Sequence, residues 1–196
     1  MSERKLAVFD FDGTLIKGDS FIQFARFAVG WPKFIGAIFR SCVALAKWKF
    51  GICDSGSAKE ILFGNIFRGM PEIEFKRLGV EFAQLIAASE RHEMIEKLEE
   101  FNKHEVPVII LTASIPTWIE PWAQRHGVLK VIGTEVEINH DGRLTGRFST
   151  PNCRCEEKVR RLNDYVHNLS EYEIWAYGDS SGDDAILAFA AHSMRL

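Results

Sequence analysis

The sequence has little of what marks several protein classes. Only two of its four cysteines, Cys153 and Cys155, lie close together, and a C-x-C pair suits neither a disulfide nor half of a zinc site. The six histidines show no ligand spacing, and the chain has no internal repeat or low-complexity tract. These absences argue against a disulfide scaffold, a zinc site and a repeat protein, and they favour free thiols in a reducing compartment.

A long uncharged hydrophobic run is also missing. Residues 17–50 are rich in Phe and Trp, but a basic residue recurs every seven positions from Arg26 to Lys47, and Gly30-Trp31-Pro32 interrupts the stretch. This pattern does not suit a transmembrane helix. The N-terminal Met-Ser-Glu-Arg-Lys passes directly into a predicted strand, so we expect no signal peptide and a cytoplasmic location.

Negative charge is almost absent from one segment of an otherwise acidic chain. Residues 17–50 contain six basic residues and one acidic residue, Asp19, so this segment has a charge of +5. The net charge of the whole chain is −3, so the remaining residues together have a charge of −8. Such a basic stripe is most often a solvated helix face. Because Phe and Trp surround it, peripheral contact with an anionic membrane through residues 20–50 is the second interpretation, and both stay open.

The residues that are present organise around the stretch from Leu6 to Thr14. Leu6 to Phe9 predict a short buried strand, and Asp10 and Asp12 follow it before a Gly-Thr turn. Side chains two apart on an extended chain point to the same side, so the two carboxylates should converge. Two like charges at one place are costly unless a cation neutralises them or one of them holds a proton. We therefore expect the chemistry here.

Helical periodicity dominates the first half of the chain. Helices are expected at about 21–30, 32–50, 57–68, 71–88 and 90–104, the first with a capping box formed by Ser20 and Gln23. The 196 residues allow one domain with a large insertion. We predict that residues 1–14 and 89–196 form a core and that 15–88 form an inserted helical cap.

The second half alternates strands with helices. Strands are expected at 106–112, 128–132, 173–177 and 192–196, and a β-hairpin from 135–138 and 143–148 should turn on Asp141-Gly142. Helices are expected from 114 to 126, at 155–168 and from 184 to 191. Alternating strands and helices predict an α/β fold with a doubly wound parallel sheet, to which the helical cap and the small β-hairpin are added.

Ligands of such sheets bind beyond the carboxyl ends of the strands. Asp10, Thr112 and Asp179 each stand at or just past a predicted strand end. Several carboxylates around one point, with no His or Cys nearby, suit a hard cation such as Mg²⁺. A hydroxyl, a lysine and the backbone amides around Phe11 and Ala113 would suit phosphate oxygens.

Four motifs carry a family resemblance. The stretches Asp-Phe-Asp-Gly-Thr, Leu-Thr112-Ala-Ser, a downstream Lys158 and Gly-Asp179-Ser-Ser-Gly-Asp183 occur in the order of motifs I to IV of the haloacid dehalogenase-like (HAD) hydrolase superfamily. The helical insertion between the first two resembles the C1-type cap of the phosphoserine-phosphatase-like subgroup (subfamily IB). The motifs span both ends of the chain, and each lies at a predicted strand end or helix start.

The resemblance implies a role for each acidic residue. Asp10 would be the nucleophile that forms an aspartyl-phosphate, and Asp12 would be the general acid and base. Asp10 and Asp179 would bind Mg²⁺ directly, and the backbone carbonyl of Asp12 would be a further ligand. Asp183 would bind the cation through a water molecule or would support its direct ligands.

The same resemblance implies which residues bind the phosphoryl group. Thr112, the backbone around Ala113 and Lys158 would bind it, and Lys158 would also neutralise Asp10. Lys158 could instead be an ordinary surface lysine of a helix that carries Arg154, Arg160 and Arg161 nearby. The run from Cys153 to Lys158 resembles a pattern of the subgroup and favours the functional interpretation.

Asp19 has two interpretations. It lies nine residues after Asp10, where phosphoserine phosphatases carry a glutamate that reads the amino group of the substrate. It could equally be a helix N-terminal carboxylate beside a Ser20 cap. The difference between Asp and Glu counts against phosphoserine itself as the substrate.

These observations predict an enzyme, a Mg²⁺-dependent phosphomonoester hydrolase acting on a small phosphorylated metabolite or a phosphoserine-like compound, with no nucleic-acid partner. A lipid phosphate phosphatase of the phosphatidylglycerophosphatase type is one alternative. A receiver-like phospho-acceptor without turnover is another, although receivers lack so large a helical insertion. A non-catalytic membrane-surface protein is the third, and the full motif set argues against it.

Overall fold

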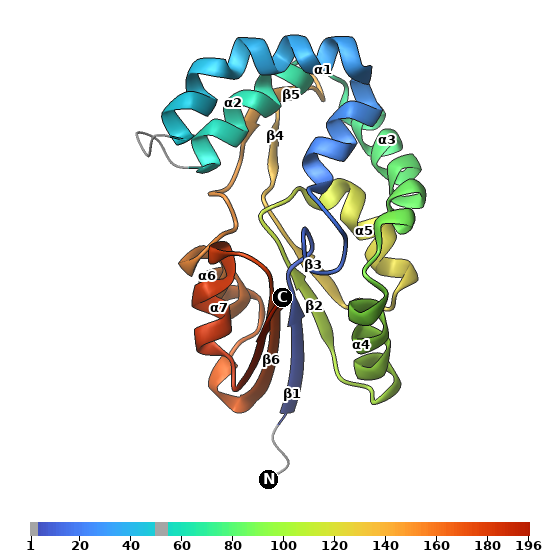
Figure 1. Ribbon diagram of the computed structural model, residues 1–196, viewed down its shortest axis with the longest axis vertical. Coiled ribbons are helices and arrows are strands. Elements are labelled where there is room, and N and C mark those ends of the chain that lie inside the picture. The colour runs from blue at the N-terminus through green and yellow to red at the C-terminus, as the bar shows by residue number, and fades with distance from the viewer. Residues whose placement is uncertain (1–3, 50–54) are drawn as a thin grey trace.

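A five-stranded parallel sheet forms the centre of the protein. The computed structural model describes residues 4–49 and 55–196. The strands are β1 (Arg4–Phe9), β2 (Val108–Leu111), β3 (Lys130–Ile132), β6 (Tyr172–Gly178) and β7 (His192–Arg195), in the order β3-β2-β1-β6-β7. Each neighbouring pair is parallel, as Figure 1 shows for the long strands. The predicted α/β class with a parallel sheet is confirmed.

Helices cover both faces of this sheet because the central strand is apolar on both sides. Ala7 and Phe9 of β1 pack in one cluster with α4 (His92–Lys103) and α5 (Pro116–Arg125). Leu6 and Val8 pack in a second cluster with α6 (Glu156–Tyr165) and α7 (Asp184–Phe189). Alternate residues of a strand point to opposite faces, so this continuous apolar run supplies both cores.

Three further helices lie beyond the carboxyl ends of the strands. They are α1 (Ser20–Lys49), α2 (Ser55–Phe67) and α3 (Glu72–Leu85), at the top of the molecule in Figure 1. Gly30 breaks α1 into two segments with φ 74° and ψ 165°, and Pro32 follows in the first turn of the second segment. The predicted interruption at Gly30-Trp31-Pro32 is therefore present, and the predicted break at 51–56 falls mostly outside the described residues. Within the described ranges, no helix combines the length and apolarity needed to cross a bilayer.

An aromatic cluster joins these helices to the sheet layer. The ring of Phe24 stacks on Trp118 of α5 at 4.3 Å between centroids, and it also contacts Phe67, Phe75 and Phe82. All of these side chains are buried and belong to the cluster that includes Phe9 of β1. The helical layer and the sheet thus share one hydrophobic core.

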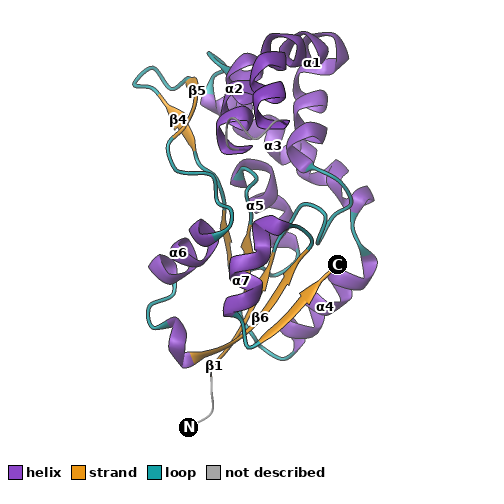
Figure 2. Ribbon diagram, turned by 60° about the vertical axis from the view of Figure 1, so that its left-hand side comes forward, coloured by secondary structure: helices purple, strands orange, loops and turns teal. Residues whose placement is uncertain are grey.

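The antiparallel hairpin of β4 (Val136–Ile138) and β5 (Leu144–Phe148) leaves the sheet and packs beside α2, as Figure 2 shows. Its turn contains Gly142 at φ +68°. A side chain on Gly64 of α2 would come within 2.9 Å of the carbonyl of Gly146, so both glycines allow this close approach. Short 3₁₀ helices at Ile86–Ser89, Leu169–Glu171 and Ser181–Asp183 complete the described elements.

Candidate active site

Three strand ends carry residues of the predicted site. Asp10 follows β1, Thr112 follows β2 and Asp179 follows β6, all at the edge of the sheet that faces the helical layer (Figure 2). Asp10, Asp179 and Asp183 each offer a carboxylate oxygen, and these oxygens lie within 4.8 Å of one another. The grouping arises because β1 pairs with both β2 and β6.

Lys158 lies in the middle of this acidic cluster. Its side chain is 2% exposed, and its Nζ donates to Asp10 Oδ1 at 2.6 Å and to Asp183 Oδ1 at 2.5 Å. Burial works against the charged form, but the two carboxylates outweigh it and raise the pKa of Lys158. The structure therefore places a permanent ammonium against Asp10, and the surface-lysine interpretation is wrong.

Negative charge still exceeds positive charge around Asp10. Burial raises the pKa of Asp10 to about 7, and Asp183 adds to the rise, although Lys158 opposes it. Burial and Asp183 also raise the pKa of Asp179. Three oxygen donors that repel one another match the preference of a hard divalent cation, which would stabilise their charged forms.

Asp183 already has partners for both of its oxygens. Oδ1 accepts from Lys158, and Oδ2 accepts from the backbone N of Ser180 at 3.1 Å and from its hydroxyl at 3.0 Å. Burial raises its pKa, but Lys158 and Ser180 outweigh this and lower it overall. This carboxylate is thus held as an anion and orients Lys158.

Gly13 and Gly178 allow the acidic loops to approach one another. Gly13 has φ +78°, and a Cβ there would lie 2.0 Å from Asp179 Oδ2. A Cβ on Gly178 would lie 2.5 Å from the Cβ of Asp183. The chain therefore needs glycine at position 13, where it faces Asp179, and at position 178, where it faces Asp183.

Asp12 is held by different partners from Asp10. Its Oδ1 accepts from the backbone N of Ser20 at 2.6 Å, and its Oδ2 accepts from the hydroxyl of Ser114. Ser114 in turn accepts from the Ser20 hydroxyl, which accepts from Trp118 Nε1 at 3.0 Å. Burial and the charge of Asp19 raise the pKa of Asp12, while the two serine donors lower it.

Asp19 caps the first helix. Its Oδ1 accepts from the backbone N of Ile22 at 3.0 Å, so Asp19 is the N-cap of α1. The predicted Ser20–Gln23 capping box is wrong, because the side chain of Ser20 bonds to the Ser114–Trp118 network instead. Asp19 also lies near enough to Asp12 for its negative charge to raise the pKa of that carboxyl.

The loop after β2 is fixed on both sides. The hydroxyl of Thr112, which is buried, accepts from the backbone N of Ser114 at 3.0 Å. The carbonyl of Ala113 accepts from Thr134 at 2.8 Å and from Lys59 Nζ at 3.0 Å. The loop is therefore tied both to the strand layer and to α2.

Lys59 is a site residue that the sequence did not reveal. Burial lowers its pKa, although Asp19, Asp12 and Asp10 oppose this, so the ammonium lies within their field. The side chain also lies over the ring of Phe21, 5.2 Å from its centroid. A single lysine in an otherwise unremarkable helix gives no local signal, so only the packing of α2 over the sheet places it here.

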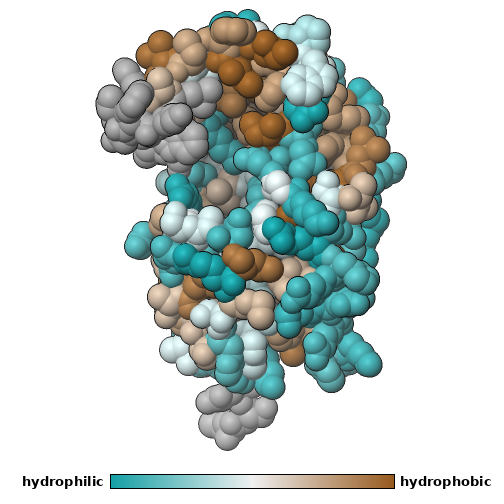
Figure 3. Space-filling model, viewed as in Figure 1, coloured by the Kyte–Doolittle hydropathy of each residue, from teal (hydrophilic) through white to brown (hydrophobic). Residues whose placement is uncertain are grey.

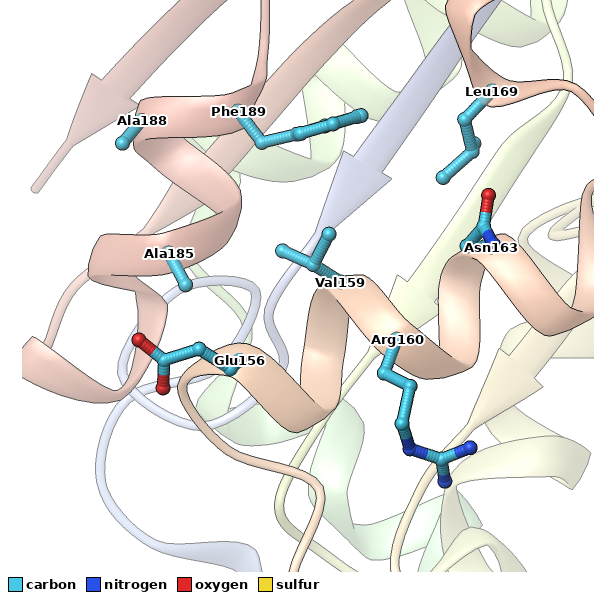
Figure 4. A pocket seen from close by; sticks show the side chains of 8 residues that line it. All are labelled: Glu156, Val159, Arg160, Asn163, Leu169, Ala185, Ala188 and Phe189. Carbon is cyan, nitrogen blue, oxygen red and sulfur yellow. The ribbon is translucent and has the colours of Figure 1, made fainter.

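A separate cavity of about 600 Å³ lies between α6 and α7 (Figure 4). Glu156, Val159, Arg160 and Asn163 line it from one face of α6. Lys158 points from the opposite face, because residues three or four apart share a helix face. This cavity contains none of the site residues described above.

Comparison with known proteins gives a family for this arrangement. The profile of the haloacid dehalogenase-like hydrolases matches residues 7–188. Protein CicA of Caulobacter vibrioides (strain NA1000 / CB15N) is 32% identical over 189 residues, covering 96% of this chain and 84% of that protein. A histidinol-phosphatase of Neisseria meningitidis serogroup C is 27% identical over 210 residues, covering 98% of this chain and 90% of that protein.

Solved structures share the fold. A protein of unknown function from Bordetella pertussis Tohama I superposes with a TM-score of 0.82 at 27% identity, covering 98% of this chain and 89% of that one. A substrate-bound phosphoserine phosphatase superposes with a TM-score of 0.66 at 15% identity, covering 100% of this chain and 87% of that one.

Proposed function

The chain belongs to the haloacid dehalogenase-like hydrolase family, and from this membership we propose that it is a Mg²⁺-dependent phosphomonoester hydrolase that works through an aspartyl-phosphate on Asp10. The family and the enzyme class expected from the four motifs are confirmed. The observation that carries the finer proposal is the position of Lys158, whose Nζ bridges Asp10 and Asp183 beside Asp179.

Asp10 supplies the nucleophile. One carboxylate oxygen forms a bond to phosphorus while the bond from phosphorus to the leaving oxygen breaks, which leaves the phosphoryl group on Asp10. Lys158 occupies Oδ1 of Asp10, and Thr14 lies 3.5 Å from Oδ2, so Oδ2 is the less tightly held oxygen. We assign the attack to Oδ2.

Asp12 moves the proton. It donates a proton to the leaving oxygen in the first step, and its carboxylate then takes a proton from the attacking water in the second. Water attacks the phosphorus, the bond to Asp10 breaks, and inorganic phosphate leaves. Ser20 and Ser114 fix the carboxyl of Asp12, which supports Asp12 as the residue that transfers the proton and Asp10 as the nucleophile.

Asp10 and Asp179 would hold Mg²⁺, with the backbone carbonyl of Asp12 as a further ligand. Asp183 would act indirectly, through its hydrogen bond with Lys158. When bound, the cation supplies positive charge that neutralises the phosphate and the carboxylates. The fit rests on the donor set, because three mutually repelling carboxylate oxygens within 4.8 Å suit an oxygen-loving cation.

Thr112, the backbone of Ala113 and Lys158 hold the phosphoryl oxygens in this proposal. Lys59 adds positive charge from α2, where it donates to the carbonyl of Ala113. Phosphate monoesters hydrolyse extremely slowly without a catalyst, and aligned positive groups lower this barrier chiefly by electrostatic stabilisation.

Residues 15–88 act as a cap over the core formed by 1–14 and 89–196. Support comes from Ser20 of α1, which donates to Asp12, and from Lys59 of α2, which donates to Ala113. Asp19, the N-cap of α1, adds a negative charge that raises the pKa of Asp12. The cap would select the substrate, a small phosphorylated metabolite or phosphoserine-like compound, with Asp19 as the specificity residue. The names of the histidinol-phosphatase relative and of the phosphoserine phosphatases of like fold favour such substrates. The cytoplasmic location stays a prediction.

The test is hydrolysis of p-nitrophenyl phosphate by the purified protein. We expect activity with Mg²⁺, its loss with EDTA and no turnover in Asp10→Asn, whereas the surface variant Asp164→Asn should keep wild-type activity. An Asp10→Asn variant as active as the wild type would refute the mechanism. Mass spectrometry after acid quenching decides the receiver-like alternative, which requires a phosphorylated Asp10 that persists for minutes without release of phosphate.

A further inference from the structure

The second segment of α1 carries an exposed apolar face on the outside of the protein. We define this outer face by Trp31, Ile35, Ile38, Phe39 and Val43, which follow one another at intervals of one to four residues along one side of the helix. Phe39 is 73% exposed, Val43 64% and Trp31 55%. Figure 3 shows hydrophobic side chains gathered at the top of the molecule, where Figure 1 places α1.

Packing of the fold does not account for this face. The opposite side of the same segment already supplies the buried contacts, through Phe34, Ala37, Ser41 and Ala44. At 100° per residue these positions form a separate stripe from the outer face. Scattered exposed apolar residues are normal, but a contiguous row of large ones marks an interaction surface.

Positive charge borders the outer face. From Ser20 to Lys49, α1 has five basic residues and no acidic one, while the whole chain carries a net −3. Lys33 and Arg40 are exposed and lie seven residues apart, on the same edge of the helix. Arg26 lies over the ring of Trp31, 4.0 Å from its centroid. Apolar and aromatic side chains bordered by Lys and Arg are the composition of helices that lie in the surface of anionic membranes.

We propose that the outer face of α1 docks on the surface of a bilayer containing anionic lipids. The charge favours this occupant over a second copy, because two copies paired through this face would bring like charges together. Acidic surface elsewhere on the chain would be repelled by the bilayer, so the charge distribution also orients the protein with α1 towards it.

The outer face is separate from the site. The site lies at the N-terminal end of α1, where Ser20 N donates to Asp12, whereas the outer face begins eleven residues later, after the bend at Gly30. The proposal thus adds a membrane surface to the enzyme and does not depend on the phosphatase mechanism.

The test is co-sedimentation of the full chain with vesicles of phosphatidylcholine alone or with about one-third phosphatidylglycerol. We expect binding only to the anionic vesicles, weakened at least about tenfold when salt rises from 0.05 to about 0.5 M. The Phe39→Ser/Val43→Ser variant should lose at least about tenfold in binding, because two exposed apolar side chains no longer insert. Lys33→Glu should also weaken binding to the anionic vesicles, because it replaces a positive charge beside the outer face with a negative one.

Ile73→Ser is the matched control, since Ile73 is 81% exposed on α3 and lies outside this face. It should bind as the wild type does. Absence of wild-type binding to anionic vesicles, or wild-type binding by the Phe39→Ser/Val43→Ser variant, overturns the proposal. Self-association that this variant abolishes, without vesicle binding, assigns the face to a second copy and also overturns it. Thermal unfolding of the Phe39→Ser/Val43→Ser variant should be unchanged, which shows that any loss of vesicle binding is not caused by misfolding. Its turnover of p-nitrophenyl phosphate should also be unchanged, so the membrane proposal and the proposed phosphatase function can fail independently.

Discussion

Replacing Asp10 with Asn should stabilise the cation-free protein while it abolishes turnover. Asp10 is buried beside Asp183 and Asp179, and burial raises its pKa from 3.8 to about 7 despite the contact with Lys158. Asparagine keeps the shape of the side chain and the carbonyl oxygen that accepts from Lys158, but it brings no charge into this cluster. The variant therefore tests whether the site stores unfavourable electrostatic energy for its chemistry.

The size of the effect follows from the pKa. Well below pH 4, folded and unfolded chains both hold the Asp10 proton, so its ionisation does not affect stability there. Between about pH 4 and 7 the unfolded chain releases the proton while the folded one retains it, and wild-type stability falls as the pH rises. A rise from 3.8 to about 7 corresponds to roughly 4 kcal/mol above pH 7, at about 1.4 kcal/mol for each unit.

The assay is urea or thermal unfolding in EDTA across pH 5 to 8. We expect Asp10→Asn to exceed the wild type by an amount that grows with pH and reaches on the order of 10 °C in Tm at pH 8. Mg²⁺ at about 100 times its Kd should then stabilise the wild type by about 2.7 kcal/mol and narrow the gap. Asp164→Asn, on the exposed surface, should change stability by less than about 0.5 kcal/mol.

Equal stability of Asp10→Asn and wild type at pH 8 in EDTA would refute this reasoning. It would mean that Lys158 fully compensates the acidic cluster and that the cluster does not require a cation. A stability difference between Asp10→Asn and the wild type that became smaller as the pH rose would also refute it. A raised pKa of Asp10 requires this difference to grow with pH.

Other substitutions test the parts of the site that packing assembled. Lys59→Met keeps side-chain length without charge, so kcat/KM for p-nitrophenyl phosphate should fall roughly tenfold with unfolding unchanged, and unaltered kinetics would remove Lys59 from the site. Gly13→Ala should lose at least about a hundredfold in activity because its methyl group would displace Asp179. Gly142→Ala is its control, since it has a similar positive φ with open space around it, and activity there should persist. Phe75→Ala should cost about 3–5 kcal/mol in urea unfolding, and a loss below about 1 kcal/mol would show that the aromatic cluster does not unite the two layers.

Local pattern was sufficient for most of the fold. The apolar runs at Leu6–Phe9 and 108–111 and the alternation of strands with helices predicted the sheet elements, since these periodicities depend only on neighbouring residues. Boundaries moved by a few residues, as with the helix expected at 71–88, which ends at Leu85 and continues as a 3₁₀ turn. The predicted cap of the first helix was wrong because two adjacent residues, Asp19 and Ser20, could both cap it. The side chain of Ser20 instead accepts a hydrogen bond from Trp118, a contact that only the tertiary structure provides.

By itself, the sequence determined where the acidic residues stand along the chain and that they follow strands. That was enough to expect Asp10 and Asp179 at one edge of a parallel sheet, because strand ends of such a sheet coincide. The tertiary structure alone decided the partners: Lys158 between Asp10 and Asp183, Ser114 on Asp12, and Lys59 reaching across from α2.

The tertiary structure also decided which apolar residues stay in water. In α1 both stripes are hydrophobic, so periodicity cannot tell the one that packs on the protein from the one that faces outward. Phe34 and Ala37 became buried, while Phe39 and Val43 stayed exposed. The physical reason is the same for the site and for the surface: a pattern fixes the direction of a side chain relative to its own element, and only packing between elements fixes what it meets.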